Sequence, residues 1–279
     1  MILSMKNKPI IIVAGEPNSV FLETFFKSIK KRKFFRPLIL ICSIKILKFH
    51  MKKLNFKRNV NLIDPLNINF KNLNNKCINI INVKYEQNYT FKKISKVSND
   101  YIKNSFNLAF EIINSGISDR LINGPISKKS FLNKKFLGIT EYISHKFSIK
   151  ENAMLIHNKK LSVCPVTTHL PLKVVSKNIN KKLIKEKIAL IDNFYKIRFG
   201  YRPRIAVLGL NPHCESIYKI NEDEQIIKPT VRQLSNLGFK TSGPYSADTI
   251  FLKKNRSKFD VVVGMYHDQV LTPMKTLFE

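Results

Sequence analysis

Three histidines are the residues of this sequence whose type and context best suit chemistry. His169, His213 and His267 each follow a short apolar run by a few residues and stand among Pro, Gly, Thr or Asn. Imidazole suits a borderline metal such as Zn²⁺, and three protein ligands with one open position form the usual catalytic arrangement. Their wide separation carries no local metal signature, so three polar loop histidines remain an equal alternative.

Two carboxylates and a lysine accompany these histidines. Asp248 lies in the segment Ala247-Asp248-Thr249, and Asp268 directly follows His267. Either carboxylate could ligate a metal or orient an imidazole, although a helix cap or a surface group is the alternative for each. Lys275 follows a proline and a methionine and is predicted to lie in a loop, which favours contact with an anion over a purely solvated side chain.

The elements that must position these groups are short apolar runs alternating with amphipathic stretches. Each run leads into small or turn-forming residues, and the alternation predicts an α/β fold with a mainly parallel sheet. In such sheets ligands bind beyond the carboxyl ends of the strands, where the three histidines would lie. The apolar runs are 10–15, 38–43, 121–122, 161–166, 204–208 and 259–263, and the helical patterns are 20–33, 103–115, 181–197 and 224–237.

The segment 56–99 is rich in Asn and Lys and has weak periodicity. It predicts little beyond edge strands and loops. The sequence contains neither a Walker P-loop nor a G-x-G-x-x-G motif, so neither an NTPase nor an ordinary Rossmann dinucleotide site is supported.

The composition bounds the class of protein. The chain has 279 residues and a formal net charge of +30, and its 44% hydrophobic content is enough for a sizeable core. Such a positive charge would suit a nucleic-acid partner. Recognition of nucleic acid, however, would favour clustered arginines and aromatic side chains on which bases stack. The abundance of Lys, Ile and Asn instead indicates compositional drift, and a nucleic-acid partner is not expected.

The compartment predicted from the sequence is the cytoplasm. The first residues show no secretory signal, and the longest apolar stretch, 37–49, is interrupted by Lys45 and is short of the roughly 20 residues that a membrane span needs. No membrane association is therefore expected. The cysteines have no C-x-x-C spacing, which favours reduced thiols over a disulfide frame or a zinc ribbon: Cys42, Cys77, Cys164 and Cys214.

Several short segments together carry a resemblance to a known family. They occur in the order Gly15-Glu16-Pro17, Asn123-Gly124-Pro125-Ile126, Gly138-Ile139-Thr140-Glu141, Thr167-Thr168-His169-Leu170-Pro171-Leu172, Gly209-Leu210-Asn211-Pro212-His213, Gly243-Pro244 with Ala247-Asp248-Thr249, and Met265-Tyr266-His267-Asp268-Gln269. The ordered set resembles the 4-hydroxythreonine-4-phosphate dehydrogenase (PdxA) family of vitamin B6 biosynthesis, from Gly15 to Lys275.

The resemblance implies a specific fold and reaction. The family has a two-lobed α/β fold like that of isocitrate and isopropylmalate dehydrogenases, acts as a homodimer, and uses NAD or NADP with a divalent metal such as Zn, Mg or Co. It oxidises the secondary alcohol of 4-phosphohydroxy-L-threonine, and the β-keto acid formed loses CO₂ to give 3-amino-2-oxopropyl phosphate. The expected lobes are 1–125 plus 255–279, and 126–254.

The resemblance also assigns roles to residues of this chain. It implies that His169, His213 and His267 are the metal ligands, one of them supplied across the dimer interface, and that Thr140 and Lys275 contact the substrate. A metal bound to the alcohol would lower its pKa and stabilise the enolate left by decarboxylation. With Asp248 and Lys275, the three histidines make up the expected catalytic set.

Departures from the family pattern keep two alternatives open. Ile139 stands where members usually have a histidine, which allows a sister dehydrogenase acting on a threonate or erythronate phosphate. Glycine-rich continuations are replaced by Asn18-Ser19-Val20 and Cys214-Glu215-Ser216-Ile217. Members also continue well past the position of Glu279, so the chain is expected to lack a C-terminal segment of the substrate and cofactor sites. The second alternative is accordingly an inactive, truncated basic binding protein.

Overall fold

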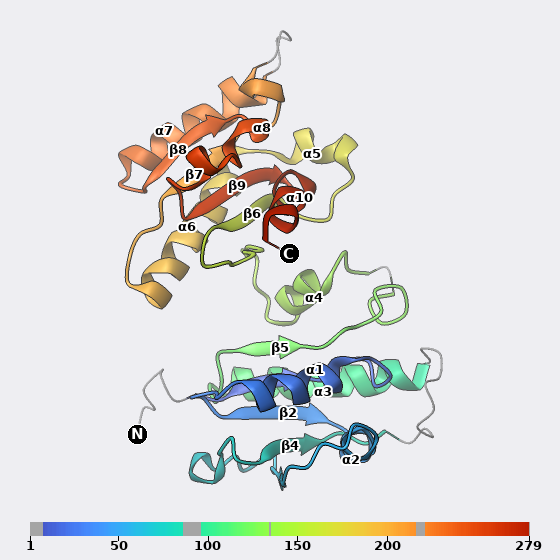
Figure 1. Cartoon of the computed structure of the whole chain (residues 1–279). Coiled ribbons are helices and arrows are strands. Elements are labelled where there is room, and N and C mark those ends of the chain that lie inside the picture. Colours follow the sequence, from blue (N-terminus) through green and yellow to red (C-terminus); the bar gives the residue numbers. More distant parts are fainter. Residues whose placement is uncertain (1–7, 86–95, 134, 216–220, 279) are drawn as a thin grey trace. The chain divides into compact units, whose positions relative to one another are not determined.

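The computed structural model in Figure 1 describes residues 8–85, 96–133, 135–215 and 221–278. The chain forms two compact units, Met1–Phe147 and Ser148–Glu279. This division differs from the expected lobes: residues 126–147 belong to the first unit and residues 255–279 to the second. The reason for the second difference is local packing, because the strand and helix that follow residue 260 complete the sheet and core of the second unit.

The first unit is built on a five-stranded sheet in the order β3-β4-β2-β1-β5, and all of its strand pairs are parallel. The strands β1 and β2 are continuous apolar runs because both faces of the sheet are covered. Every residue of β2 is buried. The strands are β1 (Ile10–Val13), β2 (Leu38–Cys42), β3 (Val60–Leu62), β4 (Ile78–Asn82) and β5 (Leu121–Asn123).

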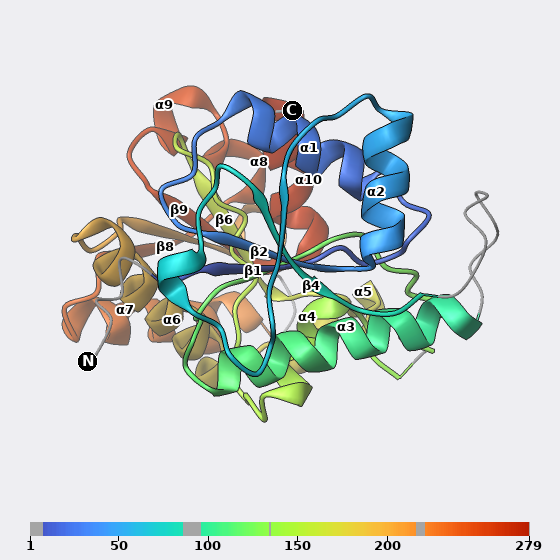
Figure 2. The same cartoon turned by 90° about the horizontal axis from the view of Figure 1, so that it is seen from below.

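Helices cover both faces of this sheet, with α1 and α2 on one side and α3 on the other (Figure 2). In α1, Leu22, Phe25 and Phe26 recur at helical spacing and are buried. The helices of the first unit are α1 (Phe21–Lys31), α2 (Ile44–Lys53), the 3₁₀ turn η1 (Phe70–Asn72), α3 (Lys96–Asn114) and α4 (Ile139–Lys146).

The expectation for residues 56–99 was wrong in one respect. The strand β4 lies inside the sheet, between β3 and β2, and is not an edge strand. Its pattern was hidden because Asn79 interrupts the apolar run, yet this side chain is buried and donates to the carbonyls of Leu38 and Asn74 at 3.0 and 2.9 Å. Hydrogen bonds of this kind offset the cost of burying an amide. The part of this expectation that concerns residues 86–95 lies outside the described residues.

The second unit is built on a four-stranded sheet in the order β6-β9-β7-β8, and its strand pairs are also parallel. The strands are β6 (Ser162–Thr167), β7 (Ile205–Leu208), β8 (Thr241–Tyr245) and β9 (Val261–Tyr266). The sequence predicted three of these, and it missed β8, whose Gly243 and Pro244 argue against a strand. The predicted α/β class with parallel strands is confirmed in both units.

Successive residues of β9 pack in two separate cores, one on each face of this sheet, because side chains alternate between the two faces of a strand. Val261 and Val263 pack in one core with residues of α5, α6 and α7, whereas Val262 packs in the other with residues of α8 and α10. The helices are α5 (Leu172–Asn178), α6 (Lys181–Phe199), η2 (Pro212–Cys214), the π-helical turn η3 (Asp223–Ile227), α7 (Lys228–Asn236), α8 (Ala247–Ile250), α9 (Lys253–Arg256) and α10 (His267–Phe278).

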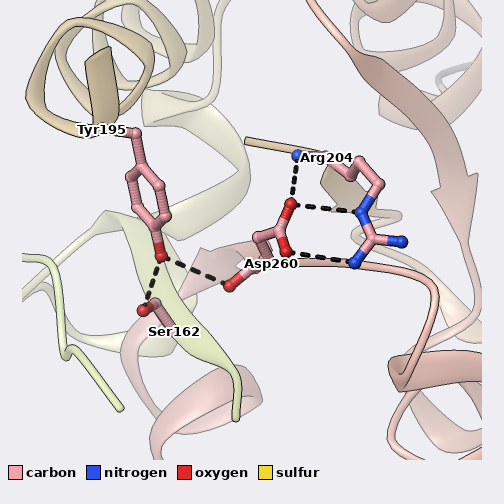
Figure 3. Close-up of polar contacts among 4 residues, drawn as sticks. All are labelled: Ser162, Tyr195, Arg204 and Asp260. Atoms are coloured by element: carbon pink, nitrogen blue, oxygen red, sulfur yellow. Dashed lines mark hydrogen bonds and ion pairs between the residues drawn. The ribbon is translucent and has the colours of Figure 1, made fainter. Parts of the chain in front are cut away.

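A polar network ties together the amino ends of three strands in the second unit (Figure 3). Asp260, just before β9, accepts from the backbone N–H of Arg204 at 2.8 Å and from its guanidinium at 3.1 Å through both oxygens. The Tyr195 hydroxyl of α6 donates to the Ser162 hydroxyl at the start of β6 at 2.9 Å. These bonds hold the edge of the sheet opposite to the one where the histidines lie.

No helix within the described parts of the chain combines the length and the apolar character that crossing a membrane requires. All four cysteines are free thiols. Burial raises the pKa of both Cys42 and Cys164 to about 12.

Candidate functional site

The carboxyl ends of β6, β7 and β9 each lead directly to one of the three histidines. His169 lies two residues beyond the end of β6, His213 follows β7 within the turn η2, and His267 is the first residue of α10. Because the strands are parallel, these three ends share one edge of the sheet. The structure therefore places all three at the kind of position where α/β proteins bind ligands.

His169 and His267 form a close pair. Their ring centroids are 5.9 Å apart, near the spacing of about 5 Å that two imidazoles on one tetrahedral zinc ion would show with Zn–N distances of about 2.0–2.1 Å. The strands beneath them are tied by Thr167, whose hydroxyl donates to the Met265 carbonyl at 2.7 Å. His267 Nδ1 lies 2.7 Å from an oxygen of Asp268, an arrangement that fixes the ring orientation.

His213 pairs instead with Asp248, which lies in α8 after the neighbouring strand β8. Its Nδ1 is 3.7 Å from Asp248 Oδ2, and the His213 side chain is 74% exposed. The Ser246 hydroxyl donates to Asp248 Oδ1 at 2.5 Å. This hydrogen bond is the largest cause of the lowered pKa of Asp248, and the electrostatic interaction with His213 adds to it. Asp248 is thus an ionised group suited to orienting an imidazole.

The backbone of the His213 turn is unusual. Both His213 and Cys214 have positive φ, 55° and 63°, in a region that glycine occupies at little cost and other residues rarely adopt. The family usually has glycines after this histidine. In this chain His213 and Cys214 adopt the left-handed geometry without being glycines. Ser216 and Ile217 of the same segment lie outside the described residues.

The site groups come as two pairs and not as one cluster. Among the residues that the structure describes, no three His, Cys, Asp or Glu side chains are grouped so that they could hold a metal ion together. His169 and His267 have the donor type and spacing for two ligands of one ion, and His213 stands at the next strand end. A three-histidine site remains a prediction for this chain.

Asp223 is a positioning residue that the sequence analysis missed. It is fully buried, and its Oδ1 accepts from the Leu210 backbone N–H at 2.7 Å. Its Oδ2 accepts from the backbone N–H and the side-chain amide of Asn211, at 3.0 and 2.8 Å. This carboxylate clamps the loop that carries His213, from the start of η3. Its ten-residue distance from His213 offers no local motif by which it could have been recognised.

Gln269 performs a similar task between two loops. Its Nε2 donates to the Gly209 carbonyl at 2.8 Å, and its Oε1 accepts from the Met265 backbone N–H at 2.7 Å. The side chain is buried, so the loop after β7 and the junction of β9 with α10 are held by one amide. Gln269 ends the motif Met265-Tyr266-His267-Asp268-Gln269, but nothing in that local pattern indicates its bond to Gly209.

Lys275 lies in a different setting from the one predicted. It belongs to α10 and not to a loop, and it is exposed. The preceding Pro273 suggested a loop, but Val270 and Met274 are four residues apart and both buried, so one face of a helix packs in the core.

Thr140 lies in the first unit, as the second residue of α4, and is half-buried. At the carboxyl end of β1 in the same unit, Glu16 is 8% exposed. Burial raises the pKa of Glu16, against the opposing effect of hydrogen bonding by the Asn18 amide and the Ser98 hydroxyl. The turn that joins β1 to Glu16 is tight. A Cβ on Gly15, whose φ is +76°, would lie 2.4 Å from the Pro125 carbonyl oxygen.

Comparison with known proteins decides the family. Residues 33–278 match the family model described as pyridoxal phosphate biosynthetic protein PdxA. The chain therefore belongs to the PdxA family. A 4-hydroxythreonine-4-phosphate dehydrogenase of Sulfurihydrogenibium sp. is 36% identical over 272 residues, which are 95% of this chain and 82% of that protein.

Solved structures of PdxA-family proteins agree. The 4-hydroxythreonine-4-phosphate dehydrogenase of Klebsiella pneumoniae superposes with a TM-score of 0.81 at 26% identity, over 98% of this chain and 85% of that chain. The corresponding protein of Burkholderia phymatum gives a TM-score of 0.78 at 27% identity, over 98% and 84% of the two chains. The resemblance inferred from the ordered motifs is confirmed, and so is the fold class that it implied.

Proposed function

We propose that this PdxA-family chain is a dehydrogenase that oxidises 4-phosphohydroxy-L-threonine in the biosynthesis of pyridoxal 5′-phosphate. The observation that carries the proposal is the His169–His267 pair at the carboxyl edge of the second sheet, in a chain of this family. The alcohol loses a hydride to NAD or NADP and a proton to solvent, and the β-keto acid product then releases CO₂ to give 3-amino-2-oxopropyl phosphate.

The residues of this chain have distinct parts in that reaction. His169, His213 and His267 would hold a divalent metal such as Zn, Mg or Co, which supplies Lewis-acid polarisation of the alcohol oxygen when bound. Asp248 orients His213, since the two lie 3.7 Å apart. Lys275 offers a cation for the substrate's phosphate or carboxylate, as a point charge on a flexible side chain. Thr140 offers a hydroxyl donor to the same substrate.

The metal proposal is tested by single substitutions with a matched control. His169→Ala and His267→Ala should abolish bound divalent metal, measured by elemental analysis of the purified protein, together with substrate-dependent reduction of NAD or NADP. His145→Ala is the control, because His145 is an exposed residue of α4. Metal content in the first two variants equal to that of the control would contradict the assignment.

We also propose a homodimer in which the metal ligands come from both subunits. Its support is that the described histidines form one close pair while His213 stands apart. Mixing His213→Ala with His267→Ala protein should restore about a quarter of the wild-type activity, since half of randomly reassorted dimers are mixed and each has one intact site of two. No recovery after mixing would contradict a shared site.

A second substrate is favoured by one specific residue. Ile139, the first residue of α4, places a half-buried apolar side chain beside Thr140. Loss of a polar contact there would suit a threonate or erythronate phosphate. The ratio of kcat/KM values for these acids and for 4-phosphohydroxy-L-threonine distinguishes the two, and Ile139→His should shift that ratio toward the amino acid.

We propose the cytoplasm as the compartment. Its support is that all four cysteines are free, two of them buried at high thiol pKa. Fractionation of the source cells, with the protein detected by antibody, tests it, and recovery in an oxidising compartment would contradict it.

A further inference from the structure

A basic cavity of about 690 Å³ lies within the first unit. Its volume falls in the range of about 300–1,000 Å³ that is usual for small-molecule sites. Six cations line it, namely Lys30, Lys31, Arg32, Lys33, Arg58 and Lys76, and its described lining contains no carboxylate. A cavity with this charge is suited to a ligand that carries several negative charges.

The cations come from three separate parts of the chain. Lys30 and Lys31 close α1, where positive charge also complements the helix dipole. That complement does not explain Arg58, which precedes β3, or Lys76, which precedes β4. Four of the six cations are the consecutive residues 30–33, and the fold brings Arg58 and Lys76 to the same cavity.

The remaining lining is partly polar, with Asn74, Asn75, Cys77 and Asn79, and partly apolar. Phe25, Ile29, Phe34, Leu38 and Ile78 contribute carbon surface to the same cavity. A simple inorganic anion would leave this surface without a partner. A ligand with a flat ring as well as charged groups would cover it, since aromatic side chains pack well against rings.

The walls are held in place by hydrogen bonds that need no ligand. Arg58 donates through Nε to the Lys76 carbonyl at 3.2 Å and through Nη1 to the Ile29 carbonyl at 3.3 Å. Of its five N–H donors, these bonds use two. Asn75 donates to the carbonyls of Phe34 and Arg36 at 2.8 and 2.7 Å. A site whose walls are fixed beforehand loses less freedom when a ligand binds.

The cavity is separate from the motif residues of the same unit. Leu38 and Ile78 are the first residues of β2 and β4, so the cavity opens at the amino edge of the sheet. Glu16, by contrast, follows the carboxyl end of β1. Because the strands are parallel, these edges are opposite, and the cavity is distinct from any ligand site at the carboxyl edge.

We propose that this cavity binds a nucleoside polyphosphate, with the phosphates among the six cations and the base on the apolar surface. Three or four phosphate charges match the number of cations better than a monoester does, and guanidinium groups favour bidentate contact with phosphate. The site is additional to the dehydrogenase reaction.

The test is calorimetric titration of the full chain with ATP, in the presence of saturating NAD so that the dinucleotide site is filled. Lys31→Gln with Arg32→Gln should weaken ATP binding at least about tenfold, since each charge removed also removes a charge-assisted hydrogen bond. Lys253→Gln with Lys254→Gln, which removes the same charge from α9 in the second unit, is the matched control.

A third variant and two further ligands complete the experiment. Arg58→Gln should also weaken binding, and thermal unfolding of this variant shows whether its fold is intact. Adenosine and inorganic triphosphate should each bind more weakly than ATP, because adenosine lacks the phosphates that the cations would contact and triphosphate lacks a base for the apolar surface. Dehydrogenase activity without ATP should not change in the Lys31/Arg32 variant.

Three outcomes would overturn the proposal. They are an absence of ATP binding, equal weakening by the control pair, and binding of a single-stranded RNA that is tighter than that of ATP and lost in the same variants. The last would identify an RNA surface. None of these outcomes affects the dehydrogenase proposal, whose tests use other residues.

Discussion

Replacement of Asp223 by Asn is expected to release the loop that carries His213. The carboxylate accepts three hydrogen bonds, from two backbone N–H groups and from the side-chain amide of Asn211. An asparagine keeps one acceptor oxygen and places an NH₂ group against a donor. The variant therefore loses at least the Leu210 bond or both Asn211 bonds, within a fully buried site.

The magnitude follows from the charge of the acceptor. A hydrogen bond to a charged group contributes about 1.5–3 kcal/mol, and an unsatisfied buried donor adds a cost of its own. Because about 1.4 kcal/mol corresponds to a factor of ten, opening of the loop should become about ten to one hundred times more frequent. The sheet should change less than the loop, because the hydrogen bonds that are lost end on the loop residues Leu210 and Asn211.

The measurement is hydrogen–deuterium exchange of the peptide spanning 209–213, in wild type and variant. Glu222→Gln is the matched control: it removes the neighbouring carboxylate, which accepts one bond from Asn211 at 3.2 Å. The Asp223→Asn peptide should exchange about ten to one hundred times faster than the Glu222→Gln peptide. Equal exchange in the two variants would refute the view that Asp223 fixes the His213 loop.

Three further predictions concern stability and reactivity. Burial would raise the pKa of Asp260, but the hydrogen bonds and charge of Arg204 outweigh it and lower the pKa. The Asp260–Arg204 pair should therefore stabilise the fold above about pH 4 and lose this effect as pH falls. The free energy of urea unfolding of Asp260→Asn should accordingly approach that of wild type in acid. A Cβ on Gly124 would lie 2.0 Å from the Ala14 carbonyl oxygen, so Gly124→Ala should lower the melting temperature, and an unchanged value would contradict that close approach. Burial raises the pKa of Cys164 to about 12, so mass spectrometry should find it unalkylated by iodoacetamide until urea unfolds the protein.

The sequence predicted the strands whose residues are apolar without interruption. Runs such as 38–43 and 204–208 became β2 and β7 because a strand covered on both faces needs no polar residue. Strands whose burial depends on distant partners were not predictable. Asn79 is acceptable inside β4 only because the Leu38 and Asn74 carbonyls are there to accept from it.

The same limit applies to the candidate site. The three histidines could be recognised because a strand end followed by Pro, Gly or Asn is a local pattern. Asp223 and Gln269 could not, because each acts on a loop that reaches it only through the tertiary fold. Lys275 was misplaced because a local proline signal was outweighed by packing of the α10 face.

The sequence by itself determined the fold class, the family and the order of the histidine motifs, since these rest on short-range hydrophobic pattern and on residues that can be compared one by one. Only the tertiary structure decided that His169 pairs with His267 while His213 faces Asp248. It alone brought Arg58 and Lys76 to the cavity that the consecutive basic residues 30–33 also line. The physical reason is that strand order, here β6-β9-β7-β8, sets which chain segments become neighbours, and this order results from packing over long sequence distances.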